Sequence, residues 1–273
     1  MSAKEGFSIL VFTKAVGFVH LSIPDAVAAV EALGAEHGFT VDATDDATRF
    51  TDVNLARYAA VVFVHTTGDV LPEPSQRTAL ENYIHNGGGF FGVHAASAMG
   101  TRVVDEWPFY RDLVGASFKG HTAAYVYADE PMEIPGVIHK GPLAAAPADA
   151  EAAGPGLWPA IRMVSWEPAV VNVEDMGSPA MRGMRQQMVR SDEWYGFHEN
   201  PRPHVHVLAT VDESTYDPFT GAMGPDHPIA WWRPFQGGRS IYNAMGHTAA
   251  TWNDQAFRES ILGGIQMAAG VAS

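Results

Sequence analysis

Short apolar runs alternate with amphipathic segments through the first hundred residues. The apolar runs are rich in β-branched and aromatic residues, as in strands buried on both faces, and they span residues 7–13, 39–44, 59–65 and 89–93. Between them, apolar side chains recur at helical spacing over 22–38, which starts with Ser22 and Pro24, and over 74–86. This alternation predicts an α/β fold with a mainly parallel central sheet and helices on both faces.

The regular pattern fades from about residue 100 to 190 and then returns. Within that stretch we expect strands at 125–128 and 163–174, and a surface insertion at 139–159, which is rich in Ala, Pro and Gly. The C-terminal third predicts strands and a closing helix, at 204–211, 229–232, 239–245 and 254–269. Since no internal repeat or linker is evident, we expect a single domain, 1–273, with an irregular insertion around 100–190.

Composition and charge narrow the classes of partner. The 273 residues include 17 Lys plus Arg and 31 Asp plus Glu, a formal net charge of -14. Such a surface repels phosphate backbones and anionic lipid, so neither nucleic acid nor membrane is an expected partner, whereas a neutral sugar is compatible. The absence of cysteine excludes thiolate nucleophiles and iron–sulfur clusters. The apolar run before Lys14 is too short for a signal sequence, which favours a cytoplasmic location.

His94 stands at the end of the predicted strand 89–93, within the sequence GVHAA. In doubly wound sheets, ligands bind outside the carboxyl ends of the strands. The same five residues have the form of a nucleophile elbow, in which small flanking residues allow a tight strand-to-helix turn. An imidazole at this turn can perform acid–base chemistry near neutral pH. The alternative is a core histidine bonded to the backbone.

Three other histidines occupy comparable positions. His20 follows the first predicted strand, His247 follows the strand 239–245, and His121 lies in the sequence FKGHT. Each alone is more often structural, but together with His94 they predict a shared pocket. His20, His94 and His247 are also candidate ligands for a divalent metal such as zinc, although no compact motif of the H-E-x-x-H kind supports one.

The segment 190–201 adds two adjacent carboxylates, Asp192 and Glu193, next to Trp194 and Tyr195. Neighbouring residues on an extended chain point opposite ways, so one carboxylate can face a pocket while the other caps or pairs with a cation. The aromatic rings suit the apolar C–H faces of a sugar. The alternative is an ordinary surface loop.

Several stretches resemble the ThuA-like family, named for trehalose utilisation. They are KAVGFVHLSIPDAVAAV, YIHNGGGFFGVHAAS, LVGASFKGH, DEWYGF, VHVLATVDE and DHPIAWWRPFQGGRSIYNAMGHTAATWNDQAFRESILGGIQMAA. The resemblance implies a flavodoxin-like fold similar to class I glutamine amidotransferases, and a role in carbohydrate catabolism beside sugar oxidoreductases that make 3-keto glycosides. Two departures, Thr122 after His121 and HKGPL at 139–143 in place of a His-Pro segment, put the role of His121 in doubt.

The resemblance also explains the elbow. In the related amidotransferases a cysteine nucleophile occupies this position, and here it is His94, so glutaminase activity is excluded. We expect an enzyme that cleaves a glycoside or 3-keto-glycoside by acid–base elimination or hydrolysis, with His94 as central residue and His20 or His247 as its partner. Glu193 or Asp192 would orient an imidazole or a sugar hydroxyl, and Trp194 and Tyr195 would pack on the ring.

Two alternatives stay open at this point. One is a metal-assisted sugar lyase or hydrolase; no cofactor is required by the acid–base scheme, but a divalent metal is compatible with the residue types. The other is a non-catalytic sugar-binding or regulatory module. The sugar, the linkage and the existence of a homo-oligomer are not determined by the sequence.

Overall fold

Half of the central sheet is parallel and is built from both ends of the chain. The computed structural model describes residues 6–130, 137–152 and 162–272. The parallel strands, in their order across the sheet, are β2 (Thr40–Thr44), β1 (Ser8–Phe12), β3 (Ala60–Val64), β4 (Gly89–Val93) and β15 (Gly238–Asn243). All except the edge strand β2 are largely buried, as their apolar sequences predict.

The other half of the sheet is antiparallel, so the prediction of a mainly parallel sheet is corrected to a mixed one. Beyond β15 follow β14 (Pro228–Phe235), β13 (His206–Asp212), β10 (Glu167–Val173) and β11 (Gln187–Asp192), which complete nine strands among the described residues. The direction changes at the two-residue turn Gln236-Gly237, where both residues have positive φ, as in a type I′ hairpin.

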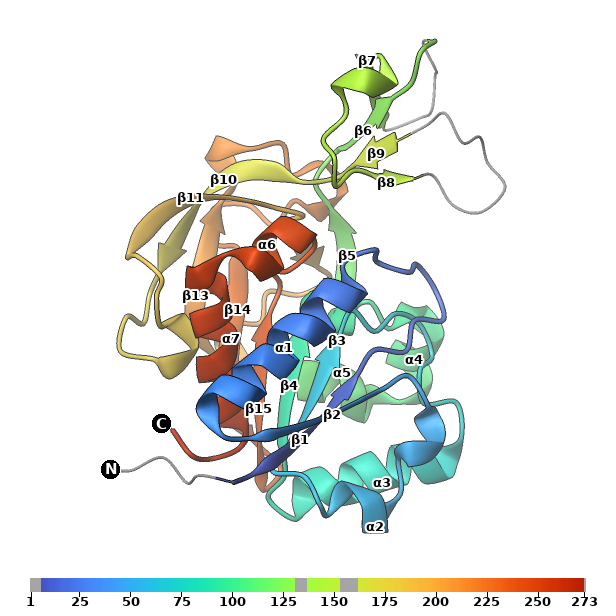
Figure 1. Ribbon diagram of the computed structural model, residues 1–273, viewed down its shortest axis with the longest axis vertical. Helices are drawn as coiled ribbons and strands as arrows, with labels where there is room; N and C mark the ends of the chain where they lie inside the picture. Colours follow the sequence, from blue (N-terminus) through green and yellow to red (C-terminus); the bar gives the residue numbers. More distant parts are fainter. Residues whose placement is uncertain (1–5, 131–136, 153–161, 273) are drawn as a thin grey trace.

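Helices cover both faces of the sheet (Figure 1). Neighbouring residues of β4 show this, because Phe91 lies under Gly264 of one helix while Phe90 packs edge-on against Tyr110 of another. The helices on the Phe91 side are α1 (Ile23–His37), α6 (Ala249–Asn253) and α7 (Gln255–Ala268). The remaining helices are α2 (Asp52–Leu55), α3 (Pro74–His85), α4 (Gly100–Glu106) and α5 (Pro108–Val114).

The two glycines inside α7 have distinct packing roles. A Cβ at position 264 would lie 2.7 Å from the ring of Phe91, so Gly264 lets the helix approach the sheet. A Cβ at position 263 would lie 1.6 Å from the carbonyl oxygen of Pro179, so Gly263 admits the short helix η4 (Pro179–Met181) instead.

The irregular middle of the chain forms two small sheets. One pairs β5 (Phe118–His121) with β12 (Tyr195–Phe197). The other, at the top of Figure 1, has the order β7 (Val137–Gly141), β6 (Ala124–Tyr127), β9 (Arg162–Val164) and β8 (Glu151–Ala152). The predicted strand 163–174 is therefore two strands, β9 and β10, divided at Ser165 and Trp166. Part of the predicted insertion, 153–159, lies outside the described residues.

None of the helices in the described part of the chain has the length and apolar character needed to cross a membrane.

Candidate active site

His94 occupies a tight turn at the end of β4, as its sequence predicts. It begins the short helix η2 (His94–Ser97) with φ +50°, a left-handed conformation that is strained for a residue with a side chain. A Cβ at position 92 would lie 3.2 Å from the Cβ of Ala96, which explains why the turn needs small residues at both flanking positions. The turn directs the imidazole of His94 into the protein, where the residue is fully buried.

Four predicted site residues converge at the carboxyl ends of the strands. His20 follows β1, His94 follows β4, Glu193 follows β11 and His247 follows β15. One nitrogen or carboxylate oxygen from each of these four side chains lies within 4.8 Å of the others. All four residues are at least 95% buried, with relative exposures of 3%, 0%, 5% and 2% in that order.

Three of these atoms are in direct contact. The distance is 3.2 Å from His94 Nε2 to Glu193 Oε2, 3.2 Å from His94 Nε2 to His247 Nδ1, and 3.0 Å from His247 Nδ1 to Glu193 Oε2. His94 Nδ1 donates to the carbonyl oxygen of Ala244 at 2.6 Å. In the neutral imidazole this hydrogen bond leaves the Nε2 lone pair directed at Glu193 and His247.

Asp192 lies beside the cluster and holds its backbone. Its carboxylate accepts hydrogen bonds from the backbone N–H groups of Glu193, Gly246 and His247 at 2.9–3.0 Å, and from the Thr251 hydroxyl at 3.3 Å. One carboxylate of the pair therefore faces the histidines and the other caps backbone donors, as their alternation predicts.

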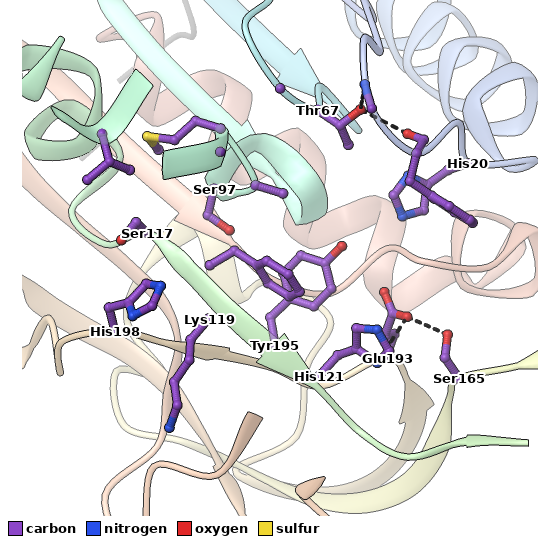
Figure 2. A pocket seen from close by; sticks show the side chains of 18 of the residues that line it. His20, Thr67, Ser97, Ser117, Lys119, His121, Ser165, Glu193, Tyr195 and His198 are labelled. Atoms are coloured by element: carbon purple, nitrogen blue, oxygen red, sulfur yellow. Dashed lines mark hydrogen bonds and ion pairs between the residues drawn. The ribbon is translucent and has the colours of Figure 1, made fainter. Parts of the chain in front are cut away.

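A pocket of about 730 Å³ opens next to the cluster. Figure 2 shows His20, Glu193, His121 and Ser165 gathered at one end and Lys119 and His198 at the other, with Tyr195 between them. His94 and His247 are not among the residues that line this pocket. The sequence-based choice of His94 as the central residue therefore meets a geometric difficulty, since a fully buried imidazole reaches a ligand only through its neighbours.

His121 is the most exposed histidine beside Glu193, with a side-chain exposure of 33%. Its Nδ1 donates to the carbonyl oxygen of Thr122 at 2.7 Å and lies 3.6 Å from Glu193 Oε1. The Ser165 hydroxyl also contacts Glu193 and donates a hydrogen bond to the same Oε1. In the neutral tautomer set by the Thr122 carbonyl, the Nε2 of His121 carries the lone pair.

Tyr195 lines the pocket, but Trp194 does not. The indole of Trp194 is 1% exposed, donates its Nε1–H to the carbonyl oxygen of Glu167 at 2.8 Å, and lies near Tyr216. The expectation that Trp194 packs on a sugar ring is therefore wrong for this structure, because consecutive residues point to opposite sides and Tyr195 takes the pocket side.

The sequence reasoning missed His65, Ser22 and Ser165. His65 ends β3 just as His94 ends β4, has φ +53°, and stacks on His20 with ring centroids 4.6 Å apart, so its position at a strand end was an available signal. Ser22 is predicted only as the start of the helix 22–38. Its hydroxyl makes no capping bond to α1; it donates to the carbonyl oxygen of His247 at 2.6 Å and accepts from His65 Nε2 at 3.2 Å. No sequence pattern indicates Ser165.

Burial and mutual contact set the charges of the cluster. Burial lowers the pKa of His20 and of His65 well below the ordinary value, and the neighbouring histidines lower both further. Burial alone would raise the pKa of Glu193, but the attraction and hydrogen bonds of His247, His94 and His121 outweigh it, and its pKa is well below the ordinary value. The low pKa values keep Glu193 ionised and His20 and His65 neutral near neutral pH.

Comparison with known proteins now identifies the family. Residues 8–268 match the family described as ThuA, trehalose utilisation. The chain belongs to the ThuA family. No curated protein matches it. Among solved structures, a ThuA-like protein from Bacteroides uniformis is 21% identical with a TM-score of 0.69, covering 98% of this chain and 94% of that one.

Two further structures share the fold. A ThuA-like protein from Parabacteroides merdae is 19% identical with a TM-score of 0.64, covering 97% of this chain and 90% of that one. A protein from Salmonella typhimurium is 10% identical with a TM-score of 0.51, covering 95% of this chain and 98% of that one. The ThuA fold is thus an α/β fold with a large mixed sheet, and membership of this family points to a sugar-related function.

Proposed function

We propose that this ThuA protein is an enzyme of carbohydrate catabolism that cleaves a 3-keto-glycoside by acid–base chemistry. The observation that carries the proposal is the position of His121, which presents an imidazole to the pocket and is backed by the Glu193 carboxylate at 3.6 Å. A carboxylate in this position stabilises the imidazolium that forms when the histidine accepts a proton.

The chemistry requires few groups. A ketone at C3 of the sugar acidifies the proton on C2, and the glycosidic oxygen on C1 is a leaving group β to the resulting enolate. His121 Nε2 takes the C2 proton, the C1–O bond breaks, and the imidazolium returns the proton to the departing oxygen. The products are an alcohol and a sugar with a C1–C2 double bond conjugated to the ketone. No oxidant or reductant is consumed, and addition of water across the double bond completes a hydrolysis.

The pocket supports a substrate of this class. Its volume of about 730 Å³ falls in the range of small-molecule sites, which is roughly 300–1,000 Å³. Tyr195, Phe118 and Phe18 supply aromatic surface for the C–H face of a sugar ring, while Ser165 and Ser117 supply hydroxyl partners. The ketone at C3 must come from a prior oxidation of the corresponding hydroxyl, so a sugar oxidoreductase is the expected source of the substrate.

The experiment is a turnover assay of the purified protein on matched pairs of glycosides and their 3-keto derivatives. We expect product only from the 3-keto compounds, and a loss of about 10²- to 10⁴-fold in kcat/KM for His121→Ala, the range of positioned acid–base catalysis. His37→Asn, which alters an exposed histidine at the end of α1, is the matched control and should leave turnover unchanged.

Two results would overturn the proposal. Saturable binding without product for every 3-keto-glycoside would indicate a sugar-binding or regulatory module. Unchanged turnover in a folded His121→Ala variant would remove this residue from the reaction and return the choice to His20, the other histidine at this end of the pocket.

A further inference from the structure

The side chains of His20, His94, His247 and Glu193 bring their nitrogen and oxygen atoms together in a buried position. His94 donates its Nδ1–H to the carbonyl oxygen of Ala244, so its other ring nitrogen, Nε2, faces Glu193 Oε2 at 3.2 Å. His247 Nδ1 lies within 3.0–3.2 Å of both atoms. Nitrogen and oxygen atoms this close together, away from water, have the spacing of the ligand atoms of a bound cation.

The distances match a transition-metal site. Ligand atoms bound at 2.0–2.1 Å in a tetrahedral zinc site lie about 3.3 Å apart. The three separations among His94 Nε2, His247 Nδ1 and Glu193 Oε2 are 3.0–3.2 Å, and the fourth ligand atom, from His20, completes a set within 4.8 Å. Three imidazoles and one carboxylate favour zinc and its neighbours over calcium or magnesium, which select oxygen ligands.

His20 adds an independent observation. Its Nδ1 is buried and, within the described residues, has no hydrogen-bond partner. The ring is held by other aromatic groups, stacked on His65 and edge-on to His94 and His247 at 5.0 and 5.2 Å. A buried ring nitrogen without a partner is destabilising unless a proton donor or a metal satisfies it.

The candidate ligands have further hydrogen-bond partners of the kind that orient metal ligands. His94 donates its second ring nitrogen to the carbonyl oxygen of Ala244, and Ser165 donates to the outer oxygen of Glu193. Asp192 accepts the backbone N–H of His247 and so fixes the turn that carries this histidine. Partners of this kind set the tautomer and direction of each ligand.

We propose that His20, His94, His247 and Glu193 bind one divalent transition-metal ion of the zinc class. His20 and Glu193 also line the pocket, so the ion would lie at the pocket end where His121 stands. With four protein ligands the site would be closed, and the ion would hold Glu193 in the position where it backs His121. The inference goes beyond the proposed function, which requires no metal.

The test measures metal binding directly. The full chain, purified without a histidine tag and freed of metal with EDTA, is titrated with ZnCl2 in a calorimeter and with CoCl2 in a spectrophotometer. We expect one zinc per chain with nanomolar affinity, visible bands of four-coordinate cobalt, and a higher melting temperature in zinc. MgCl2 should give no comparable heat.

Variants locate the site. His20→Ala and Glu193→Gln should each weaken zinc binding by at least about 100-fold, since loss of even an outer partner typically weakens affinity by 10- to 100-fold. His37→Asn is the matched control, because this exposed histidine at the end of α1 is outside the four ligands, and its zinc affinity should change less than about threefold. Melting curves in EDTA establish that each variant is folded.

Absence of stoichiometric zinc binding, or full binding in the folded His20→Ala and Glu193→Gln variants, would overturn the metal site. Either result leaves the proposed glycoside cleavage standing if turnover persists in EDTA. Conversely, stoichiometric zinc with no turnover of any 3-keto-glycoside would overturn the function and keep the site.

Discussion

Replacing Asp192 by Asn tests whether this buried carboxylate holds the turn that carries His247. Asp192 Oδ1 accepts from the backbone N–H groups of Glu193 at 3.0 Å and His247 at 2.9 Å, while Oδ2 accepts from Gly246 N–H at 2.9 Å and the Thr251 hydroxyl at 3.3 Å. An amide keeps the oxygen that serves Glu193 and His247. The NH2 group of the new side chain then replaces the oxygen that accepted the Gly246 N–H, so two hydrogen-bond donors face each other and this bond is lost.

The magnitude follows from the bonds that change. The Thr251 hydroxyl can rotate to accept, so its contribution is largely retained. At Gly246, a hydrogen bond to a charged group is lost, about 1.5–3 kcal/mol, and a buried N–H is left without an acceptor, about 1–3 kcal/mol. We therefore expect Asp192→Asn to lower the free energy of unfolding by about 2.5–6 kcal/mol.

The assay is urea unfolding followed by tryptophan fluorescence, with Asp212→Asn as control. Asp212 also accepts a backbone N–H and a hydroxyl, both from Ser214, but these bonds are exposed to solvent and should contribute less than about 1 kcal/mol. Equal losses for the two variants, or a loss below about 1 kcal/mol for Asp192→Asn, would refute the view that Asp192 anchors the His247 turn.

Three further predictions concern the elbow, the buried histidines and the aromatic pair. Gly92→Val should destabilise the protein by about 1–3 kcal/mol in urea unfolding, because a Cβ added at this position would lie 3.0 Å from the Phe90 ring and 3.2 Å from Ala96 Cβ. An unchanged free energy of unfolding would contradict the close packing of the turn. In EDTA, the free energy of unfolding should fall as the pH drops below about 6.5, because burial lowers the pKa of His65 in the folded protein and the unfolded chain then binds more protons. This effect contributes up to about 1.4 kcal/mol per pH unit. His65→Gln should make the plot of unfolding free energy against pH shallower between pH 7 and 5, and an unchanged slope would count against a neutral His65. Trp194→Phe should lower stability by about 1 kcal/mol through loss of the hydrogen bond to Glu167 and leave KM for the sugar unchanged, whereas a raised KM would return Trp194 to the pocket.

Much of the site could be predicted because its residues obey a local rule. His20, His94 and His247 each come shortly after an apolar strand, and in a parallel arrangement the carboxyl ends of such strands meet at one edge of the sheet. The small residues around His94 also indicated its turn. His65 satisfies the same rule at the end of β3 and could have been included.

Which of the predicted site residues face the pocket could not be predicted. Whether His94 or His121 faces the pocket depends on how β5 and β12 pair across the end of the main sheet, a contact between segments more than 70 residues apart. The resemblance to the ThuA family left the role of His121 in doubt, because the residue after it differs. Only the tertiary packing shows that His121 is partly exposed while His94 is enclosed.

The sequence by itself determined the strands and helices of the α/β framework, the turn at His94 and the exclusion of thiol chemistry, because hydrophobic period, small residues at a turn and amino-acid composition are local properties. The tertiary structure decided the antiparallel half of the sheet, the approach of Glu193 to three histidines, and which of two neighbouring side chains, Trp194 or Tyr195, enters the pocket. These depend on strand order and on the direction of side chains across long sequence separations, which local periodicity does not encode.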